Sequence, residues 1–193
     1  MLFDADNMHY PLGDAFLEYG IPGILRMTEK KQPLDTEETA AYRHGIYLIY
    51  REVYCFIQKH AAKAGQLAEN ENDKENKDRL FRIADICRKL TQSRPETFME
   101  ALQLFWFLYL LRGGFGGGCI GRLDQKLYPF YAAEVGNHTW KREEALAAII
   151  QFYEKLNKMS AGDTLRNMML SGKNEEGNDE TNELTYLFLE AYE

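Results

Sequence analysis

The sequence predicts a mainly α-helical protein, and three observations support this fold class. Apolar residues recur at steps of three and four over long stretches, which is the period of an amphipathic helix. Residues 102–111 are apolar at nearly every position, which is typical of a helix enclosed by protein. Only the glycine run that follows and residues 168–170 are candidates for strand. We expect residues 1–193 to form a single unit.

The central stretch is residues 95–131, which joins this apolar helix to the glycine run and a second helix. We place Pro95 in the first turn, where a missing amide hydrogen costs nothing, and Glu96 and Glu100 favour the positive end of a helix. The helix spans about 17 residues, fewer than the roughly 20 apolar residues that a bilayer requires. We therefore interpret it as buried core and expect no membrane partner.

The glycine run predicts a tight site. Glycine allows the main chain to approach another group closely or to adopt a positive φ. Both interpretations place crowded backbone directly after the apolar helix. The glycines are Gly113, Gly114, Gly116, Gly117, Gly118 and Gly121.

Three helices are expected over residues 12–68, before the central stretch. Residues 12–27 predict two short helices broken at residues 20–23, because glycine ends a helix and proline begins one. Asp35 with Glu38 predicts a capping box for a long helix that ends near Ala68. An inward stripe is expected along that helix: Ile46, Ile49, Val53, Ile57, Ala61, Ala64 and Ala68.

The remaining helices follow the same rules of caps and periodicity. The charged residues 69–78 are interpreted as a loop or a frayed helix start, before a helix over 79–90. Beyond the glycine run we expect helices over 123–135, over 140–159 with Thr139 as cap, and within 181–193.

The composition excludes several classes of function. Twenty-three basic against 30 acidic residues give a net charge of −7, which argues against a nucleic-acid partner because phosphate binding needs clustered positive charge. Three widely spaced cysteines without a CxxC pair indicate a reducing cytoplasm. The four histidines share no spacing typical of metal ligands, so we expect no metal site.

Two constellations near the glycine run are candidate sites. Residues 116–121 match GxGxxG formally, but that motif binds dinucleotides only after a strand, and here a helix precedes it. Arg122, Asp124 and Gln125 are interpreted as a mutually paired polar corner, with direct substrate contact as the alternative. Cys119 lies beside this corner, and we favour a structural role for it.

Three segments carry a resemblance to a known family. PETFMEALQLFWF, IGRLDQKLYPFY and GNDETNELTYLFLEA occur in the order and at the spacing typical of glycyl radical enzymes, the pyruvate formate-lyase superfamily. RIADIC and YGIPGIL add support. The GRLDQ-LYPFY form is similar to the branch of diol dehydratases, choline lyase and arylacetate decarboxylases.

The resemblance implies a ten-stranded α/β barrel wrapped in helices, of which this chain would supply outer helices and an early strand. The family's thiyl cysteine lies in a GCxxP-like motif and its radical glycine in an RVxGY-like motif. Neither occurs here, since Gly118-Cys119 continues as Ile120-Gly121-Arg122. We therefore expect a partial chain that binds no cofactor, has no catalytic residue of its own and is inactive alone.

The longer parent enzyme would break carbon–carbon, carbon–oxygen or carbon–nitrogen bonds in the anaerobic cytoplasm, and acyl transfer by a formate C-acetyltransferase is a further activity of the family. Its glycyl radical would be installed by a radical SAM activating enzyme. The partners implied are that activase, the rest of the polypeptide and a second copy of the chain. The alternative is a stand-alone helical scaffold or regulatory protein derived from the same fold.

The resemblance also implies candidates for the substrate pocket. The dehydratase branch carries a substrate-facing histidine and serine where this chain has Gly116 and Gly117, which argues against dehydratase chemistry that uses such a pair. Another substrate-facing histidine of the branch corresponds to His9 after a shift of one residue. Cys119 completes the candidates.

Overall fold

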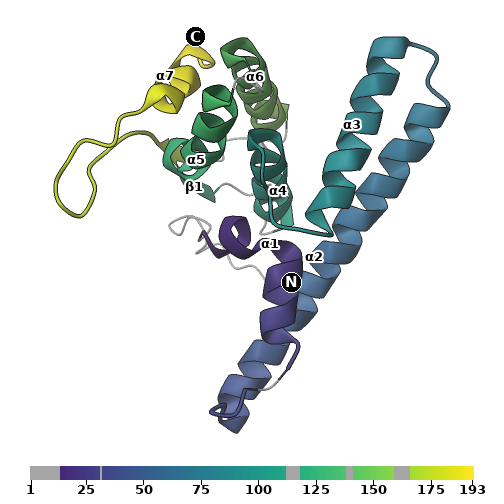
Figure 1. The fold of residues 1–193 in the computed structure, drawn as a ribbon, viewed down its shortest axis with the longest axis vertical. Coiled ribbons are helices and arrows are strands. Elements are labelled where there is room, and N and C mark those ends of the chain that lie inside the picture. The colour runs from purple at the N-terminus through teal and green to yellow at the C-terminus, as the bar shows by residue number, and fades with distance from the viewer. Residues whose placement is uncertain (1–13, 31, 112–117, 138–140, 159–165) are drawn as a thin grey trace. The chain divides into compact units, whose positions relative to one another are not determined.

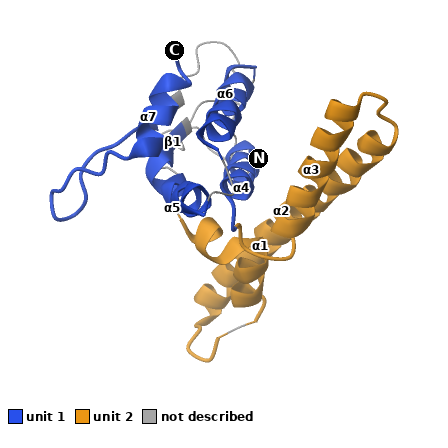
Figure 2. Ribbon diagram, turned by 45° about the horizontal axis from the view of Figure 1, so that its top comes forward, with its two compact units in different colours: residues 1–13, 96–193 blue, residues 14–95 orange. Residues whose placement is uncertain are grey.

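The computed structural model describes residues 14–30, 32–111, 118–137, 141–158 and 166–193. In this part of the chain it is mostly helical with one short sheet of two strands, which confirms the predicted fold class (Figure 1). The chain divides into two compact units, which Figure 2 distinguishes by colour: residues 14–95, and residues 96–193 together with 1–13. Whether 1–193 is a single domain stays a prediction.

The first helix of residues 14–95 is kinked where the sequence places a break. α1, Ala15–Thr28, contains Gly20 at φ 65° and ψ 172° and, two residues later, Pro22. A β-carbon on Gly20 would lie 2.6 Å from the Cα atom of Arg94. The kink therefore requires glycine both for its backbone angles and for space.

The long helix α2, Glu37–Glu69, begins one residue later than the predicted capping box implies. Thr36 is the N-cap, and its hydroxyl accepts a hydrogen bond from the amide of Thr39 at 3.2 Å. The prediction that Asp35 caps the helix was wrong, because its carboxylate instead forms a two-pronged ion pair with the guanidinium of Arg43.

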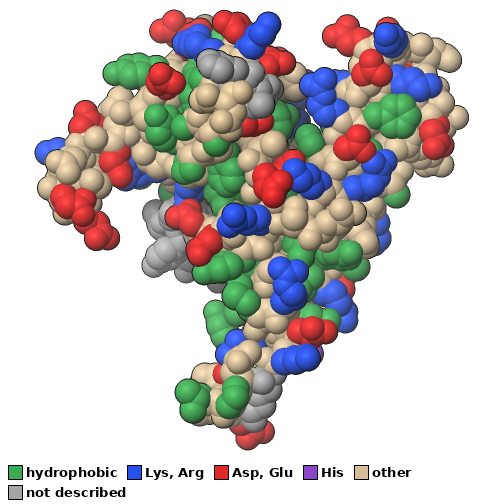
Figure 3. Space-filling view, in the orientation of Figure 1, with side chains coloured by type: hydrophobic (Ala, Val, Ile, Leu, Met, Phe, Trp, Pro, Cys, Tyr) green, Lys and Arg blue, Asp and Glu red, His purple; other side chains and the backbone are tan. Residues whose placement is uncertain are grey.

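α2 pairs with α3, Lys74–Leu90, in a long helical hairpin (Figure 1). α3 begins earlier than predicted because Asp73 caps it, accepting from the amide of Asn76 at 2.9 Å. Most of the predicted α2 stripe is buried, but Ile46 is half-buried and Ile49 is exposed. In Figure 3, Lys and Arg side chains are interspersed with Asp and Glu along this hairpin, which is typical of a solvated surface.

Within residues 96–193, the apolar helix is α4, Phe98–Leu111, and it is buried on nearly all sides as predicted. α4 begins at Phe98, so Pro95 precedes the helix and does not lie in its first turn, where the sequence predicts it. Thr97 and Glu100 form a capping box, because the Thr97 hydroxyl accepts from the Glu100 amide at 3.3 Å and a Glu100 carboxylate oxygen accepts from the Thr97 amide at 3.4 Å.

Strands β1, Gly118–Arg122, and β2, Arg166–Met169, pair in parallel. A strand therefore forms at the described end of the glycine run, and a second one includes Met168 and Met169 of the predicted segment. The register shifts between Cys119 and Gly121, and Gly121 has a φ of 77°, which only glycine adopts freely. Two helices connect the strands, as parallel pairing requires a crossover. They are α5, Leu123–Gly136, and α6, Arg142–Lys158; the predicted cap of α6, Thr139, lies outside the described residues.

The chain leaves β2 through an exposed loop that extends away from the helices (yellow-green in Figure 1) and enters α7, Glu183–Glu190. A single antiparallel bridge joins Lys173 to Asp179 within the loop. Asn182 and Thr185 form a capping box that fixes where α7 begins. α7 packs on α5 and α6.

Candidate functional site

The sequence-predicted residues Arg122, Asp124 and Gln125 lie at the corner where β1 passes into α5. Arg122 is the last residue of the strand, and Asp124 and Gln125 belong to the first turn of the helix. A strand followed directly by a helix places these three side chains within one short turn. We call this cluster, with its partners Ser171, Glu180 and Thr185, the β1–α5 corner.

Asp124 is the centre of the corner and is fully buried. Its Oδ2 atom accepts hydrogen bonds from the Ser171 amide at 2.7 Å, from the Thr185 hydroxyl at 2.6 Å and from the Gln125 side-chain amide at 3.0 Å. No donor among the described residues reaches its buried Oδ1 atom. A buried carboxylate is costly unless its oxygens accept hydrogen bonds, so these three donors are what allow it to remain there.

Arg122 and Gln125 hold the loop that leads to α7. The guanidinium of Arg122 forms an ion pair with Glu180, and the Gln125 side-chain amide donates to the Glu180 backbone carbonyl at 2.8 Å. Gly172 has a φ of 110°, and a β-carbon there would lie 3.3 Å from the Arg122 guanidinium carbon. The loop therefore passes close beneath the arginine at a residue without a side chain.

Thr185 links the corner to α7. Its hydroxyl donates to Asp124 and also accepts from the Asn182 amide at 3.2 Å, and it is itself buried. One hydroxyl thus completes the helix cap and binds the buried carboxylate. The start of α7 is thereby tied to the start of α5.

Of the other candidate residues from the sequence, the structure describes only Cys119. Gly116, Gly117 and His9 lie outside the described residues. Cys119 is a half-buried free thiol on β1, opposite Asn167 of β2. Their assignment to a substrate pocket stays a prediction, as does the role of the corner.

Sequence reasoning missed Ser171, Glu180 and Thr185, which provide most of the corner's partners. They lie 47, 58 and 61 residues from the groups that they contact. The Asn182–Thr185 capping box was the one local signal available, since Asn and Thr three residues apart precede an apolar run. Nothing in the sequence indicated that the same threonine would face Asp124.

Chemically, the β1–α5 corner can hold two helices and a strand end in register, since each of the contacts described above joins two groups of this protein. No cluster of three or more His, Cys, Asp or Glu suited to a metal occurs within the described ranges. In those ranges no helix is both long enough and apolar enough to cross a bilayer.

Comparison with known proteins gives the family. The sequence profile described as pyruvate formate lyase-like matches residues 6–193. The chain is 37% identical over 152 residues to (2S)-3-sulfopropanediol dehydratase of Klebsiella oxytoca, covering 70% of this chain and 18% of that protein. It is 31% identical over 199 residues to trans-4-hydroxy-L-proline dehydratase of Clostridioides difficile, covering 94% and 25%.

The structure agrees with these matches. A crystal structure of a glycyl radical enzyme from Archaeoglobus fulgidus superimposes with a TM-score of 0.84 at 28% identity, over 97% of this chain and 27% of that one. The chain therefore spans about a quarter or less of the length of the relatives that it matches. It belongs to the pyruvate formate lyase-like family of glycyl radical enzymes.

Proposed function

We propose that this chain is the part of a glycyl radical lyase that supplies outer helices and the first parallel strands of a ten-stranded barrel. The pair β1–β2 supports this proposal most directly. Parallel sheets are found almost only with both faces covered, and two strands alone are marginal in water. The two parallel strands among the described residues are therefore suited to be extended by further strands, and the relatives are about four times as long.

The bond that we propose for the parent enzyme is carbon–oxygen. Both relatives described above carry the name dehydratase, and neither name refers to acyl transfer. Gly116 and Gly117 replace the histidine and serine that the resemblance implies, so the substrate would be held without that pair. We keep Gly116, Gly117, Cys119 and His9 as the pocket candidates.

This chain does not itself fit the role of radical carrier. It contains neither a GCxxP-like nor an RVxGY-like motif, so no step of the radical reaction is assigned to its residues. In this proposal the β1–α5 corner positions the start of the barrel wall, while the glycyl radical, the radical SAM activase and the cytoplasmic anaerobic setting belong to the whole enzyme.

A chimera tests the proposal. This chain replaces the matching quarter of the C. difficile hydroxyproline dehydratase, and the product is incubated with that enzyme's activase. We expect a soluble protein that acquires a glycyl radical visible by electron paramagnetic resonance, whereas the isolated chain acquires none. A folded chimera that never gains the radical signal would contradict the proposal and would favour a separate helical scaffold.

A further inference from the structure

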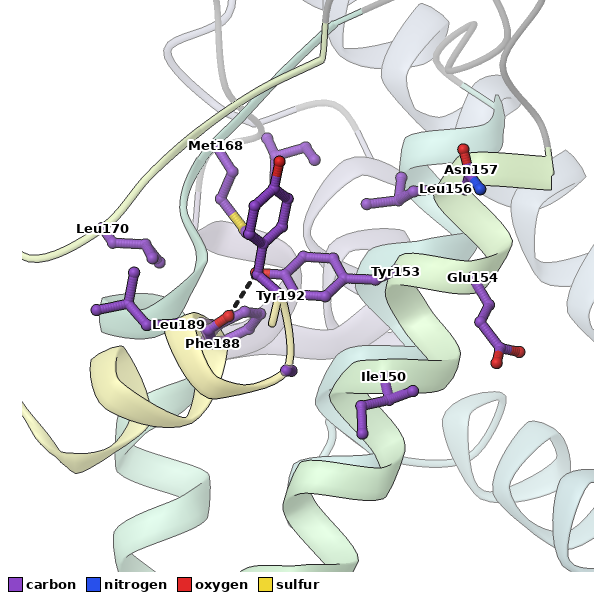
Figure 4. A pocket seen from close by; sticks show the side chains of 12 residues that line it. Ile150, Tyr153, Glu154, Leu156, Asn157, Met168, Leu170, Phe188, Leu189 and Tyr192 are labelled. Carbon is purple, nitrogen blue, oxygen red and sulfur yellow. Dashed lines mark hydrogen bonds between the residues drawn. The ribbon is translucent and has the colours of Figure 1, made fainter.

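A groove of about 670 Å³ lies between α6, the β-strands and α7 (Figure 4). All of its lining residues belong to the unit of residues 96–193. Apolar side chains form most of its wall, and Glu154 and Asn157 are its hydrophilic members besides two tyrosines. The larger non-aromatic apolar lining residues are Ile120, Ile150, Leu156, Met168, Leu170 and Leu189.

Specific contacts of Tyr153 on α6 fix the position of α7 at the wall of the groove. The Tyr153 hydroxyl donates to the Phe188 carbonyl at 3.0 Å, which is the dashed line in Figure 4. The ring of Tyr153 also meets the rings of Phe188 and Tyr192 edge-on, with centroids 6.0 and 6.3 Å apart. Burial, then Tyr192 and the charge of Asp124, raises the pKa of Tyr153, so its hydroxyl keeps its proton for this bond.

The rim of the groove leaves large apolar side chains in water. Ile150 is 40% exposed, Leu189 is 52% exposed and Tyr192 is 84% exposed. A single exposed apolar residue is ordinary, but several around one concave apolar surface are typical of an interaction site. An occupant with aliphatic or aromatic side chains would complete the wall, whereas an anionic one would lose its hydration without a partner, because the charged lining residue is Glu154.

We propose that this α6–α7 groove receives the remaining polypeptide of the glycyl radical enzyme, through an apolar segment of that polypeptide. The inference rests on the proposed function. The relatives contain about three times as much further sequence as this chain supplies, so an occupant of that origin is available. Ala191 and Tyr192 line the groove, so polypeptide joined at Glu193 would begin at its edge and would dock with little loss of chain entropy.

The test supplies the remainder as a separate chain. The part of the C. difficile hydroxyproline dehydratase that this chain does not match is co-expressed with the tagged chain and their dissociation constant is measured. The dehydratase's own matching quarter is the positive control. The groove variant carries Ile150→Asp and Leu189→Asp, and the matched control is Tyr186→Asp, because Tyr186 is 61% exposed on the same helix as Leu189 but lies outside the groove.

We expect the wild-type chain and the Tyr186→Asp variant to bind the remainder within about twofold of each other, and the groove variant to bind at least about tenfold more weakly, since burying one such side chain is worth more than a tenfold change. Circular dichroism of each variant checks that it folds. Equal binding by a folded groove variant would overturn the inference and leave the proposed function standing. A remainder that binds the positive control but not this chain would overturn both.

A second copy of the chain is the competing occupant. Sedimentation of the isolated chain tests for this dimer. A dimer that the groove substitutions dissociate, but that added remainder does not dissociate, would overturn the inference. A wild-type chain whose self-association disappears when the remainder is added supports it.

Discussion

At the residue scale, the contribution of Asp124 to stability depends on the donors around it. Asp124→Ala leaves the part-buried Ser171 amide and the buried Thr185 hydroxyl without their acceptor. Each unsatisfied buried group costs roughly 1–3 kcal/mol, so we expect the free energy of unfolding to fall by about 2–5 kcal/mol. Urea titration followed by tryptophan fluorescence measures it.

Asp124→Asn tests whether the charge or the acceptor matters. The amide oxygen can still accept from Ser171 and Thr185, so we expect about half the loss seen with alanine. Glu176→Ala, on the exposed loop of the same unit, is the control and should change the unfolding free energy by less than about 0.5 kcal/mol. An alanine variant as stable as that control would show that the corner contributes nothing.

The loop glycines give a second prediction, because they separate backbone strain from steric contact. Gly172 and Gly177 both have a positive φ, but a β-carbon would touch the Arg122 guanidinium only at Gly172. We expect Gly172→Ala to cost about 1 kcal/mol more than Gly177→Ala, as overpacking does. In an Arg122→Ala background the two substitutions should cost the same, and a persistent difference would assign the effect to strain alone.

At the element scale, the kink of α1 predicts opposite outcomes for two glycines of the same unit. Gly20→Ala would place a β-carbon within 2.6 Å of the Arg94 backbone at a φ of 65°, so we expect a loss of about 3 kcal/mol. Gly45, inside α2, has no heavy atom within 4 Å of its would-be β-carbon. Gly45→Ala should therefore stabilise by about 0.5–1 kcal/mol, because alanine favours helix.

Thermal melting of both variants by circular dichroism measures the pair. The comparison is informative because the substitution is identical and only its surroundings differ. A Gly20→Ala variant that melts with the wild type would show that the chain straightens at this point, and that the kink is not required.

The face of α3 that packs on α2 gives a prediction of pH dependence. Burial raises the pKa of Cys87 to about 11, from an ordinary value of 9.0. The unfolded chain loses this proton first as the pH rises, so stability is unaffected below about pH 9 and falls between pH 9 and 11, with a slope of up to about 1.4 kcal/mol per pH unit. Cys87→Ala should lower stability by a constant amount and remove this part of the slope. An unchanged slope would contradict the prediction.

The helices were predictable because periodicity and caps act over a few residues. Their starts were less predictable, since several acceptors compete for one helix end. Asp35 looked like a cap, yet Arg43 two turns later takes its carboxylate and Thr36 caps instead. Asp73 was the converse case, because a highly charged run concealed a cap that begins α3 at Lys74.

At the scale of the whole molecule, the candidate site was predictable only in part. Arg122, Asp124 and Gln125 are adjacent in sequence, so their clustering could be predicted. Ser171, Glu180 and Thr185 reach them through a helical crossover, and pairings of that separation have no local signature. The division into two compact units has no signal in the sequence, because α2 and α3 have the pattern of ordinary amphipathic helices and no linker composition marks Pro95.

The last prediction concerns how these units unfold. Both tryptophans, Trp106 and Trp140, lie within residues 96–193, so tryptophan fluorescence reports on that unit alone. Far-ultraviolet circular dichroism is dominated by helices of both units, α2 and α3 among them. Since α2 packs with both α1 and α3, while α7 packs with both α5 and α6, we expect the two signals to have different midpoints, which a single two-state transition forbids.

The substitutions above make this prediction specific. Gly20→Ala should lower only the midpoint for residues 14–95, which circular dichroism detects and tryptophan fluorescence does not. Asp124→Asn should lower only the midpoint for residues 96–193, which fluorescence follows. If instead either substitution moves both midpoints by the same amount, residues 14–193 unfold as one cooperative body, because a local loss can reach a distant probe only through shared unfolding. The single unit expected from the sequence would then be the correct description of this chain.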